Sequence, residues 1–436
     1  MKKTINIGLL GLGTIGSGVY KVLKKHNREY RRKLDVNLSL KKIAVKSKRK
    51  KRGVEVKPEM LTTDPLSVVN DGEIDIIIEL IGGIVPAKKL ILKALNNKKH
   101  VVTANKEVMA SFGKELFDTA NKNKVDLYFE ASVGGGIPII KPLKDSLSAN
   151  KVNKIMGIVN GTTNYILSKM TEENIGYEQA LAEAQEKGFA EKDPRADVGG
   201  GDAAAKIAIL ASIAFNSRVT KNEVFVEGIT SVTSKDIAYA ADMGHVIKLL
   251  AIAKDEGKKL EVRVHPTMIR KSHPLAAVSG PFNAVFVEGD SVGEVMFFGQ
   301  GAGSLPTASA VVSDVMEVAK NINQDVTGRR MVCTCYYDKD ISPMTEVASS
   351  YYLRMKVMDK PGVLAKIAKI FGDKKVSVKS VIQKGPAIAA GRLGHTAELV
   401  FISHPVAEAN LRAALKGIDK LAVVNKINNV IRVENS

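Results

Sequence analysis

The chain has 436 residues, of which 45% are hydrophobic and 25% charged, a composition typical of globular proteins with more than one hydrophobic core. Its net charge of +19 would suit a nucleic acid or an anionic surface, but aromatic residues make up only 5% and tryptophan is absent, which disfavours a platform for stacking single-stranded bases. No window approaches the roughly 18 uninterrupted apolar residues of a membrane-spanning helix, so we expect a cytoplasmic protein that binds neither membranes nor nucleic acid.

The first predicted element is a strand over residues 5–10, which leads into the glycine motif GLGTIG and then into a segment with helical spacing of its apolar residues. A strand, a tight glycine turn and a helix in this order predict a dinucleotide-binding unit. Glycines let the backbone approach a pyrophosphate, which the N–H groups at the start of the helix can bind. The expected cofactor-binding residues are Gly11, Gly13, Thr14, Ile15 and Gly16. A glycine turn without a ligand is the alternative.

Three further apolar stretches, at 38–45, 74–81 and 100–104, alternate with helix-like segments, a pattern typical of a parallel sheet covered on both faces. The first of them continues into KSKRKKR, at 46–52, where an NAD enzyme usually places a carboxylate for the ribose 2′-hydroxyl. Positive charge at this place suits a 2′-phosphate, so the sequence predicts NADP(H), with NAD(H) as the alternative. The expected readers of the 2′-phosphate are Lys48, Arg49 and Lys50, unless this is only a solvated basic loop.

Asn105 and Lys106 follow the stretch 100–104, just past the carboxyl end of a predicted central strand, where open α/β sheets collect ligands. A lysine at this place can meet anionic groups of a substrate or cofactor, although a single lysine after a strand is normally a surface residue. The strand predicted at 125–130 then runs into ASVGGGIP, and we expect the nucleotide domain to end near residue 135.

An alanine-rich helix, DAAAKIAILASIAF, carries the sharpest combination of residues in the next segment. Asp202 and Lys206 are four residues apart and share one helical face, which is the usual spacing of an exposed ion pair. The helix is apolar nearly all round, however, and a buried lysine is costly unless it is paired or used. Lys206 could therefore donate a proton to an oxygen that gains negative charge, and Glu191, in the preceding loop, could accept the ammonium group of an amino-acid substrate. With the glycine motif, these residues indicate carbonyl reduction by hydride.

The last part of the chain contains a polar hinge and then a βαββαβ pattern that breaks first at Asp359–Gly362. Cys333 and Cys335 lie in the hinge, and we expect two reduced thiols rather than a zinc site. The fold class predicted is α/β, with a Rossmann-type doubly wound domain, an α+β catalytic and dimerisation domain and a ferredoxin-like C-terminal domain. The expected boundaries are 1–135 for NAD(P) binding, 136–320 for catalysis, 321–350 for the linker and 351–430 for the C-terminal domain.

Five motifs, GLGTIG, VTANK, EASVGGGIPI, GIVNGTTNYIL and GFAEKDPRADVGGGDAAAK, together resemble the homoserine dehydrogenase family over essentially the whole chain. The resemblance implies the reversible, NAD(P)H-dependent reduction of L-aspartate 4-semialdehyde to L-homoserine, on the route to threonine, methionine and isoleucine. It implies Lys206 as the proton donor, Glu191 and Asp202 as substrate-binding residues, and Lys106 as a residue shared by cofactor and substrate. It also implies a monovalent cation, usually sodium, at Glu130, Val133, Gly135 and Ile137.

The segment from Tyr351 to about Val430 resembles an ACT domain, and DKPGVLAKI matches the first strand-to-helix turn of such domains. The resemblance implies amino-acid binding, with threonine as the expected effector, and a homodimer or homotetramer, unless this copy serves only in assembly. Two other functions stay open at this stage: another NAD(P)-dependent dehydrogenase of a small substrate, and a catalytically silent amino-acid sensor. The presence of Lys106, Glu191, Asp202 and Lys206 together disfavours the sensor.

Overall fold

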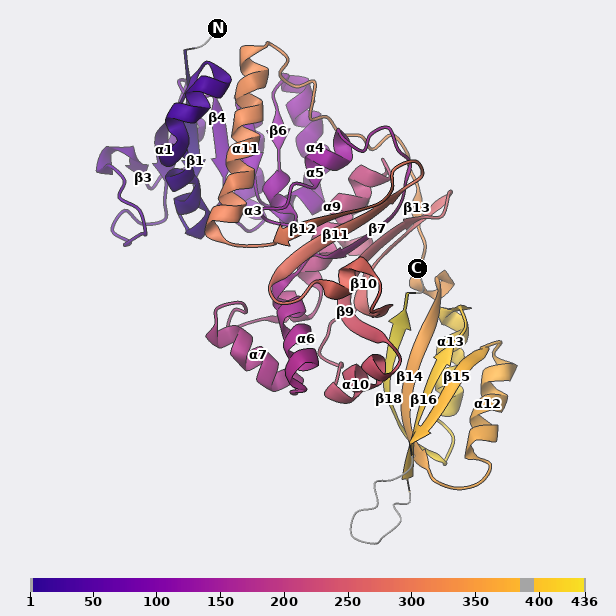
Figure 1. Cartoon of the computed structure of the whole chain (residues 1–436). Helices are drawn as coiled ribbons and strands as arrows, with labels where there is room; N and C mark the ends of the chain where they lie inside the picture. Colours follow the sequence, from indigo (N-terminus) through magenta and orange to yellow (C-terminus); the bar gives the residue numbers. More distant parts are fainter. Residues whose placement is uncertain (1–2, 385–395, 435–436) are drawn as a thin grey trace. The chain divides into compact units, whose positions relative to one another are not determined.

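The computed structural model describes residues 3–384 and 396–434, and the chain divides into two compact units (Figure 1). Unit 1 comprises Met1–Ile155, Ala205–Val224 and Phe282–Lys339, and unit 2 comprises Met156–Ala204, Phe225–Pro281 and Asp340–Ser436. The chain passes from one unit to the other inside the strand β7 (Val152–Ile158) and inside the helix α9 (Gly201–Ala214).

Unit 1 contains a six-stranded parallel sheet in the order β3-β2-β1-β4-β5-β6. Its strands are β1 (Thr4–Leu10), β2 (Asn37–Ala44), β3 (Leu61–Thr62), β4 (Ile76–Glu79), β5 (His100–Thr103) and β6 (Leu127–Tyr128). This is the strand order of doubly wound dinucleotide-binding folds, in which ligands bind where the order reverses, between β1 and β4. Every residue of β4 and β5 is buried, as expected for strands with helices on both faces. The predicted Rossmann-type domain is confirmed.

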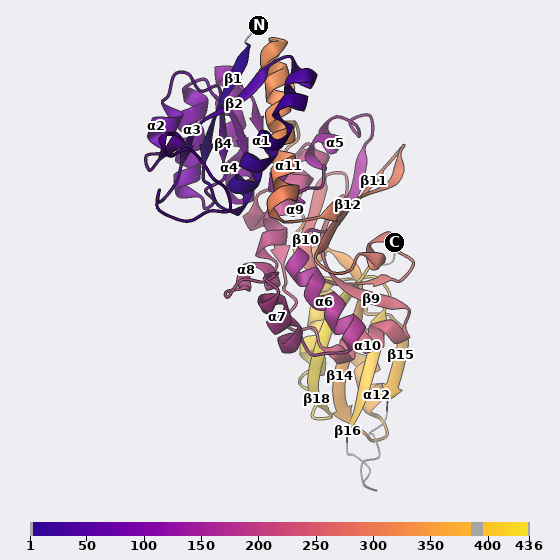
Figure 2. The same cartoon turned by 60° about the vertical axis from the view of Figure 1, so that its left-hand side comes forward.

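The helices around this sheet are α1 (Thr14–Leu34), α2 (Leu66–Val69), α3 (Val85–Asn96), α4 (Lys106–Asn123) and α11 (Ser304–Asn323). The last of them comes from far along the chain and packs along α1, as both views of the ribbon show (Figure 2). The contact is close at Gly18, where a Cβ atom would lie 2.4 Å from the carbonyl oxygen of Ser304. Because only glycine fits there, α1 and α11 can cover one face of the sheet together.

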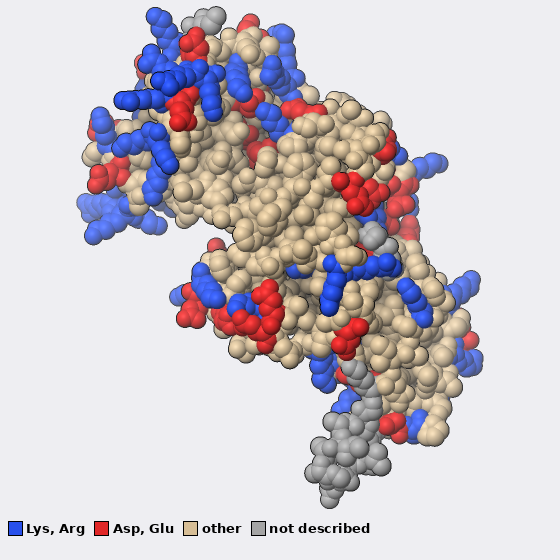
Figure 3. All heavy atoms as spheres, in the orientation of Figure 1, with Lys and Arg blue, Asp and Glu red and all other residues tan. Residues whose placement is uncertain are grey.

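Unit 1 is completed by α5 (Ile140–Lys144) and by the antiparallel hairpin of β11 (Phe282–Gly289) and β12 (Gly293–Gln300). Lysine and arginine gather on unit 1, over α1 and around the loop 46–52 (Figure 3). The exposed basic residues of α1 are Lys21, Lys24, Lys25, Arg28, Arg31, Arg32 and Lys33.

Unit 2 is built on a sheet in the order β9-β10-β18-β14-β16-β15. Its strands are β9 (His245–Asp255), β10 (Lys259–Arg270), β14 (Ala348–Met358), β15 (Val378–Lys384), β16 (Thr396–Ser403) and β18 (Val424–Val433), with short strands β8 (Phe225–Val226) and β13 (Asp340–Ile341) beside β10 and β17 (Val406–Ala407) beside β14. Its helices are α6 (Gly161–Glu173), α7 (Tyr177–Glu186), α8 (Arg195–Val198), α10 (Ser234–Asp242), α12 (Val363–Asp373) and α13 (Glu408–Ile418).

The C-terminal part of unit 2 has the order β14-α12-β15-β16-α13-β18, which confirms the predicted ferredoxin-like βαββαβ domain. Its core is formed where α12 and α13 pack on the sheet, around Leu353, Ile367, Phe371 and Phe401. Its last strand also pairs in parallel with β10, where Thr267 lies opposite Arg432. The C-terminal domain therefore shares one sheet with the β9–β10 hairpin of unit 2. Within the residues that the structure describes, no helix is long and apolar enough to cross a membrane.

Candidate active site

The glycine motif forms the turn between β1 and α1, and its glycines have different tasks. Gly11 has a φ of +100°, and a Cβ atom there would lie 2.7 Å from the carbonyl oxygen of Leu80. A Cβ atom at Gly16 would lie 2.2 Å from the carbonyl oxygen of Gly11, whereas Gly13 has no atom of the described chain within 4 Å of that position. The turn is therefore closed at Gly11 and Gly16 and open at Gly13, where an approaching ligand would meet bare backbone.

The helix α1 begins at Thr14, with Gly13 as its N-cap residue. This helix has no side-chain cap and no acidic residue in its first turn. Its first N–H groups have no intrahelical acceptor, and they carry the positive end of the helix dipole. The geometry is that of an anion-binding site, as the sequence predicted from the motif.

A cavity of about 480 Å³ opens beside the glycine turn, between the ends of β2 and β4 and the start of α3. Three basic residues line it, namely Lys46, Lys50 and Arg52. All three predicted phosphate readers are exposed, but only Lys50 lines the cavity, whereas Lys48 and Arg49 do not. The reason lies in Arg52, which donates to the carbonyl oxygen of Lys50 at 2.8 Å and to that of Ser47. Arg52 thereby folds the loop back and decides which of its side chains face the cavity.

The carboxyl ends of β4 and β5 are joined by a buried carboxyl group that sequence reasoning missed. Glu79 is fully buried, and it accepts hydrogen bonds from the Thr103 hydroxyl at 2.7 Å and from the backbone N–H of Ile81 at 2.8 Å. Burial raises the pKa of Glu79 above its ordinary value, although these hydrogen bonds oppose the shift. The only signal in the sequence was a single acid at the end of an otherwise apolar strand.

Lys106 is the first residue of α4 and is half-buried. The preceding residue, Asn105, is the N-cap of this helix, because its side chain accepts from the N–H of Val108 at 3.2 Å. The same side chain donates to the carbonyl oxygen of Gly83 at 2.8 Å. Asn105 therefore fixes the start of α4, and with it Lys106, at the carboxyl edge of the parallel sheet.

Lys206 lies on α9, and its side chain keeps only 9% of its exposure. The residues around it on this helix are buried as well, including Ala205, Ile207 and Leu210. The burial that the apolar pattern predicted is thus confirmed. In unit 1, α9 and α4 line a common pocket, so Lys206 and Lys106 lie on two neighbouring helices.

Asp202, at the start of α9, belongs to a group of polar residues in unit 2. The side-chain amide of Asn160 donates to Asp202 at 2.9 Å and to Asp197 at 2.7 Å. Asn160 is also the N-cap of α6, where it accepts from the N–H of Thr163 at 2.9 Å. One amide thus orders two carboxylates. Neither Asn160 nor Asp197 was singled out from the sequence, although both lie inside the quoted motifs.

Glu191 lies on the loop between α7 and α8 and is exposed. Its carbonyl oxygen accepts from the side-chain amide of Gln185 at 3.1 Å, which ties the loop to the end of α7. The role of its carboxylate in binding an ammonium group stays a prediction.

The predicted cation site lies in unit 1, in the turn before α5. The carboxylate of Glu130 accepts three backbone N–H groups, from Ile139 at 2.6 Å, from Ile140 at 2.7 Å and from Lys141 at 2.8 Å. Its own N–H donates to Asp314 at 2.8 Å. Burial raises the pKa of both Glu130 and Asp314. The Glu130 carboxylate therefore holds the backbone of residues 139–141 in place through these three hydrogen bonds.

The same turn offers other oxygen atoms. Gly134 and Gly135 have φ angles of +68° and +58°, which orient their peptide groups in a conformation that side chains disfavour. In the described parts of the chain, the carbonyl oxygens of Val133, Gly135 and Ile137 accept no hydrogen bond from a backbone N–H group. The buried hydroxyl of Ser132 also has no partner among the described residues. This is an oxygen-rich, buried site of the kind that suits a hard cation.

Comparison with known proteins gives three matching family models: "Homoserine dehydrogenase, NAD binding domain" over residues 11–130, "Homoserine dehydrogenase" over 138–316 and "ACT domain" over 351–423. A homoserine dehydrogenase from Synechocystis is 47% identical, covering 99% of this chain and 99% of that protein. The crystal structure of a homoserine dehydrogenase from Thiobacillus denitrificans matches with a TM-score of 0.91 at 40% identity, covering 99% of this chain and 98% of the other.

A third similar protein is a hyperthermophilic archaeal homoserine dehydrogenase mutant, whose structure was solved in complex with NADPH. It matches with a TM-score of 0.61 at 25% identity, and the alignment covers 72% of this chain and 97% of that one.

Proposed function

Since this chain belongs to the homoserine dehydrogenase family, and interconverts L-aspartate 4-semialdehyde and L-homoserine with a nicotinamide cofactor, we propose that Lys206 delivers the proton in that reaction. The observation that carries the proposal is a lysine held almost fully buried on an apolar helix. Burying an ammonium group is costly, and a protein tolerates it where the group is paired or used.

The chemistry that the cofactor supplies is hydride, given to the aldehyde carbon of the substrate. The Lys206 ammonium group donates a hydrogen bond to the aldehyde oxygen and gives up its proton as negative charge develops there. In the oxidation of homoserine the neutral amine takes the proton from the hydroxyl group. Because Lys206 retains little contact with water, its hydrogen bond to the developing alkoxide is stronger than it would be in bulk solvent.

Substrate recognition falls to Asp202 and Glu191, which we assign to the ammonium group of the amino-acid substrate. Asp202 is held by Asn160, so its carboxylate is already oriented before a substrate arrives. Lys106 is assigned to the substrate carboxylate and to the cofactor, because it begins α4 at the sheet edge where ligands of this fold bind.

The cofactor assignment is NADP(H), with its pyrophosphate at Gly11, Gly13, Thr14, Ile15 and Gly16. Lys46, Lys50 and Arg52 support the preference over NAD(H), because they bring three positive charges to the cavity beside β2. A 2′-phosphate can bind such charges, and an unmodified ribose gains nothing from them.

We further propose that the turn before α5 holds a sodium ion. The backbone carbonyl groups of Val133, Gly135 and Ile137 are the donors, and Glu130 shapes the turn through its three N–H contacts rather than lying in the coordination sphere. A cation at this place would offset the cost of the two buried carboxyl groups, Glu130 and Asp314.

The C-terminal ACT domain supports feedback regulation, and we propose L-threonine as its effector and a homodimer or homotetramer as the working assembly. Strand β18 of this domain pairs with β10, so the two belong to one sheet. A structural change at the effector site would therefore be transmitted to β10 through hydrogen-bonded strands. We also propose a cytoplasmic location, because two cysteines in the whole chain do not make the disulfide framework typical of secreted proteins.

The assay that tests the proposal follows the absorbance of the reduced nicotinamide while L-homoserine is offered with NADP⁺ and, separately, with NAD⁺. We expect oxidation with both cofactors and a higher kcat/KM with NADP⁺. A higher kcat/KM with NAD⁺ would contradict the cofactor assignment. Adding L-threonine to the same assay tests the effector, and unchanged rates would remove threonine from the proposal.

A further inference from the structure

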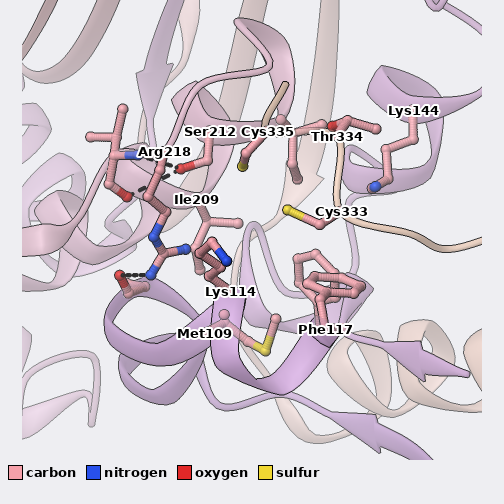
Figure 4. Close-up of a pocket in the computed structure, with 15 residues that line it drawn as sticks. Met109, Lys114, Phe117, Lys144, Ile209, Ser212, Arg218, Cys333, Thr334 and Cys335 are labelled. Carbon is pink, nitrogen blue, oxygen red and sulfur yellow. Dashed lines mark hydrogen bonds between the residues drawn. The ribbon is translucent and has the colours of Figure 1, made fainter. Parts of the chain in front are cut away.

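Cys333 and Cys335 lie together in a pocket of unit 1 whose walls are α4 and α9 (Figure 4). The pocket has a volume of about 40 Å³. Both sulfur atoms point into it, Cys335 beside Ser212 and Cys333 above Phe117. Both cysteines are partly exposed and neither is in a disulfide. A small solute can therefore reach two thiols that face the same space.

The pocket is positively charged. Lys114, Lys144 and Arg218 line it, and no carboxylate is among the described residues that do so. Lys144 donates to the carbonyl oxygen of Val332, directly before the first cysteine, and Arg218 donates to that of Ala110 at 3.2 Å. These two cations are thus held by neutral carbonyl groups, and their charge remains available to a thiolate.

The two thiols are not equivalent. Hydrogen bonding from Cys335 is the largest influence that lowers the pKa of the Cys333 thiol below its ordinary value, and the charges of Lys144 and Arg218 add to it, while burial opposes the shift. The same coupling and burial raise the pKa of Cys335. Cys333 is consequently the better nucleophile, because the thiolate and not the thiol attacks.

The backbone permits a bond between them. Residues 332–335 lie outside any helix or strand, and hydrogen bonding between the side chains of Cys333 and Cys335 keeps the two thiols close together. The Cα atoms of residues two apart in a chain are at most about 7 Å from each other, so the Cα–Cα range found in disulfides is within reach of this segment.

We propose that Cys333 and Cys335 form a redox-active dithiol that reacts with low-molecular-weight disulfides. The Cys333 thiolate attacks one sulfur of the disulfide RSSR, a bond forms between Cys333 and that sulfur, and RS⁻ leaves. Cys335 then loses its proton to solvent and attacks Cys333, which forms the Cys333–Cys335 disulfide and releases the second RS⁻. Two electrons pass from the two cysteines to RSSR, which ends as two thiols.

The test uses the reduced full-length protein, with glutathione disulfide as the probe and intact-mass measurement after acid quenching. We expect the natural protein to lose two hydrogen atoms without keeping an adduct. Cys335→Ser should accumulate one glutathione adduct, mapped to Cys333, and Cys333→Ser should react about tenfold more slowly. A natural protein that stays reduced, or a Cys333→Ser variant that reacts as fast as Cys335→Ser, would overturn the proposal.

A second measurement separates the charge effect from mere access. The rate of Cys333 alkylation by iodoacetamide should fall several-fold in Lys144→Met, because the cation nearest to Val332 is lost. Lys114→Met is the matched control, since Lys114 lines the same pocket but is already paired with Asp118 at 2.8 Å. Equal rates in the two variants would contradict the role given to Lys144. Both readouts follow thiol chemistry alone, so neither depends on the role proposed for Lys206.

Discussion

The side-chain amide of Asn160 donates a hydrogen bond to the carboxylate of Asp202 at 2.9 Å. The amide reaches Asp197 as well, so a single residue at the start of α6 sets the direction of two acidic side chains. Hydrogen bonds to charged groups contribute more than neutral ones, and a carboxylate that must meet a substrate ammonium group gains from having its orientation fixed beforehand.

Asn160→Ser should lower kcat/KM for L-homoserine by about tenfold or more, because serine can still cap α6 but cannot bridge the two carboxylates. The measurement is steady-state kinetics, with urea unfolding of the same variant as its control. We expect a free energy of unfolding within about 1 kcal/mol of the natural protein, since serine is a good N-cap residue. An unchanged kcat/KM would show that Asn160 serves the helix alone.

Arg354→Met should lower the free energy of unfolding by about 3–5 kcal/mol, because it leaves the buried carboxylate of Asp236 without its charged partner. Arg354, on β14 of the C-terminal domain, donates to Asp236 on α10 at 2.7 Å, and both side chains are buried. Urea unfolding measures this loss. The control is Lys369→Met, which removes an exposed ion pair between Lys369 and Asp373 on α12. A loss no larger than that of the control would contradict the importance of this contact.

Glu408→Gln should cost stability at neutral pH and little at acid pH. Burial would raise the pKa of Glu408, but the hydrogen bonds and charges of Arg432 and Arg412 outweigh it and hold this pKa below its ordinary value. The carboxylate therefore stabilises the fold fully above the unfolded-state pKa of about 4.3. This contribution is lost as the pH falls through the lower folded-state pKa. The measurement is the difference in unfolding free energy between natural protein and variant, and a difference that grew toward acid pH would have the wrong sign.

Lys50→Met should raise the KM for NADPH by about tenfold and leave the KM for NADH nearly unchanged, because a charge-assisted contact to the 2′-phosphate is lost. Lys48→Met is the matched control, since it removes the same charge from the same loop outside the cavity. Comparable effects on the two cofactors would mean that Lys50 does not contact the phosphate. An effect of Lys48→Met as large as that of Lys50→Met would mean that only the net charge of the loop matters.

The Rossmann-type sheet, the glycine turn and the burial of α9 could be predicted from the sequence, because each follows from a local pattern of residues. Apolar runs spaced by helices define a parallel sheet, and an apolar helix with one lysine defines a buried lysine. The C-terminal βαββαβ order was predictable for the same reason.

The parts that could not be predicted depend on contacts between distant segments. The packing of α11 against α1 has only one signal in the sequence, Gly18, and this residue is one glycine among many in the chain. The pairing of β18 with β10 and the meeting of Asn160 with Asp197 and Asp202 left no periodic signal at all. The basic loop shows the limit of prediction from sequence most clearly. The hydrogen bonds of Arg52 to the backbone of Lys50 and Ser47 determine which lysines face the cavity, and no local pattern indicates these bonds.

The proton transfer by Lys206 is tested most directly by the turnover of Lys206→Ala in both reaction directions, measured beside the dissociation constant of this variant for NADPH. Lys248→Met is the control for removing a buried lysine, since Lys248 is bound to the carbonyl oxygen of Val278 at 2.6 Å and has no role in the mechanism. We predict that Lys206→Ala lowers kcat by about 10²- to 10⁴-fold with NADPH affinity nearly unchanged, and that Lys248→Met keeps its turnover. A Lys206→Ala variant with normal turnover would contradict the account.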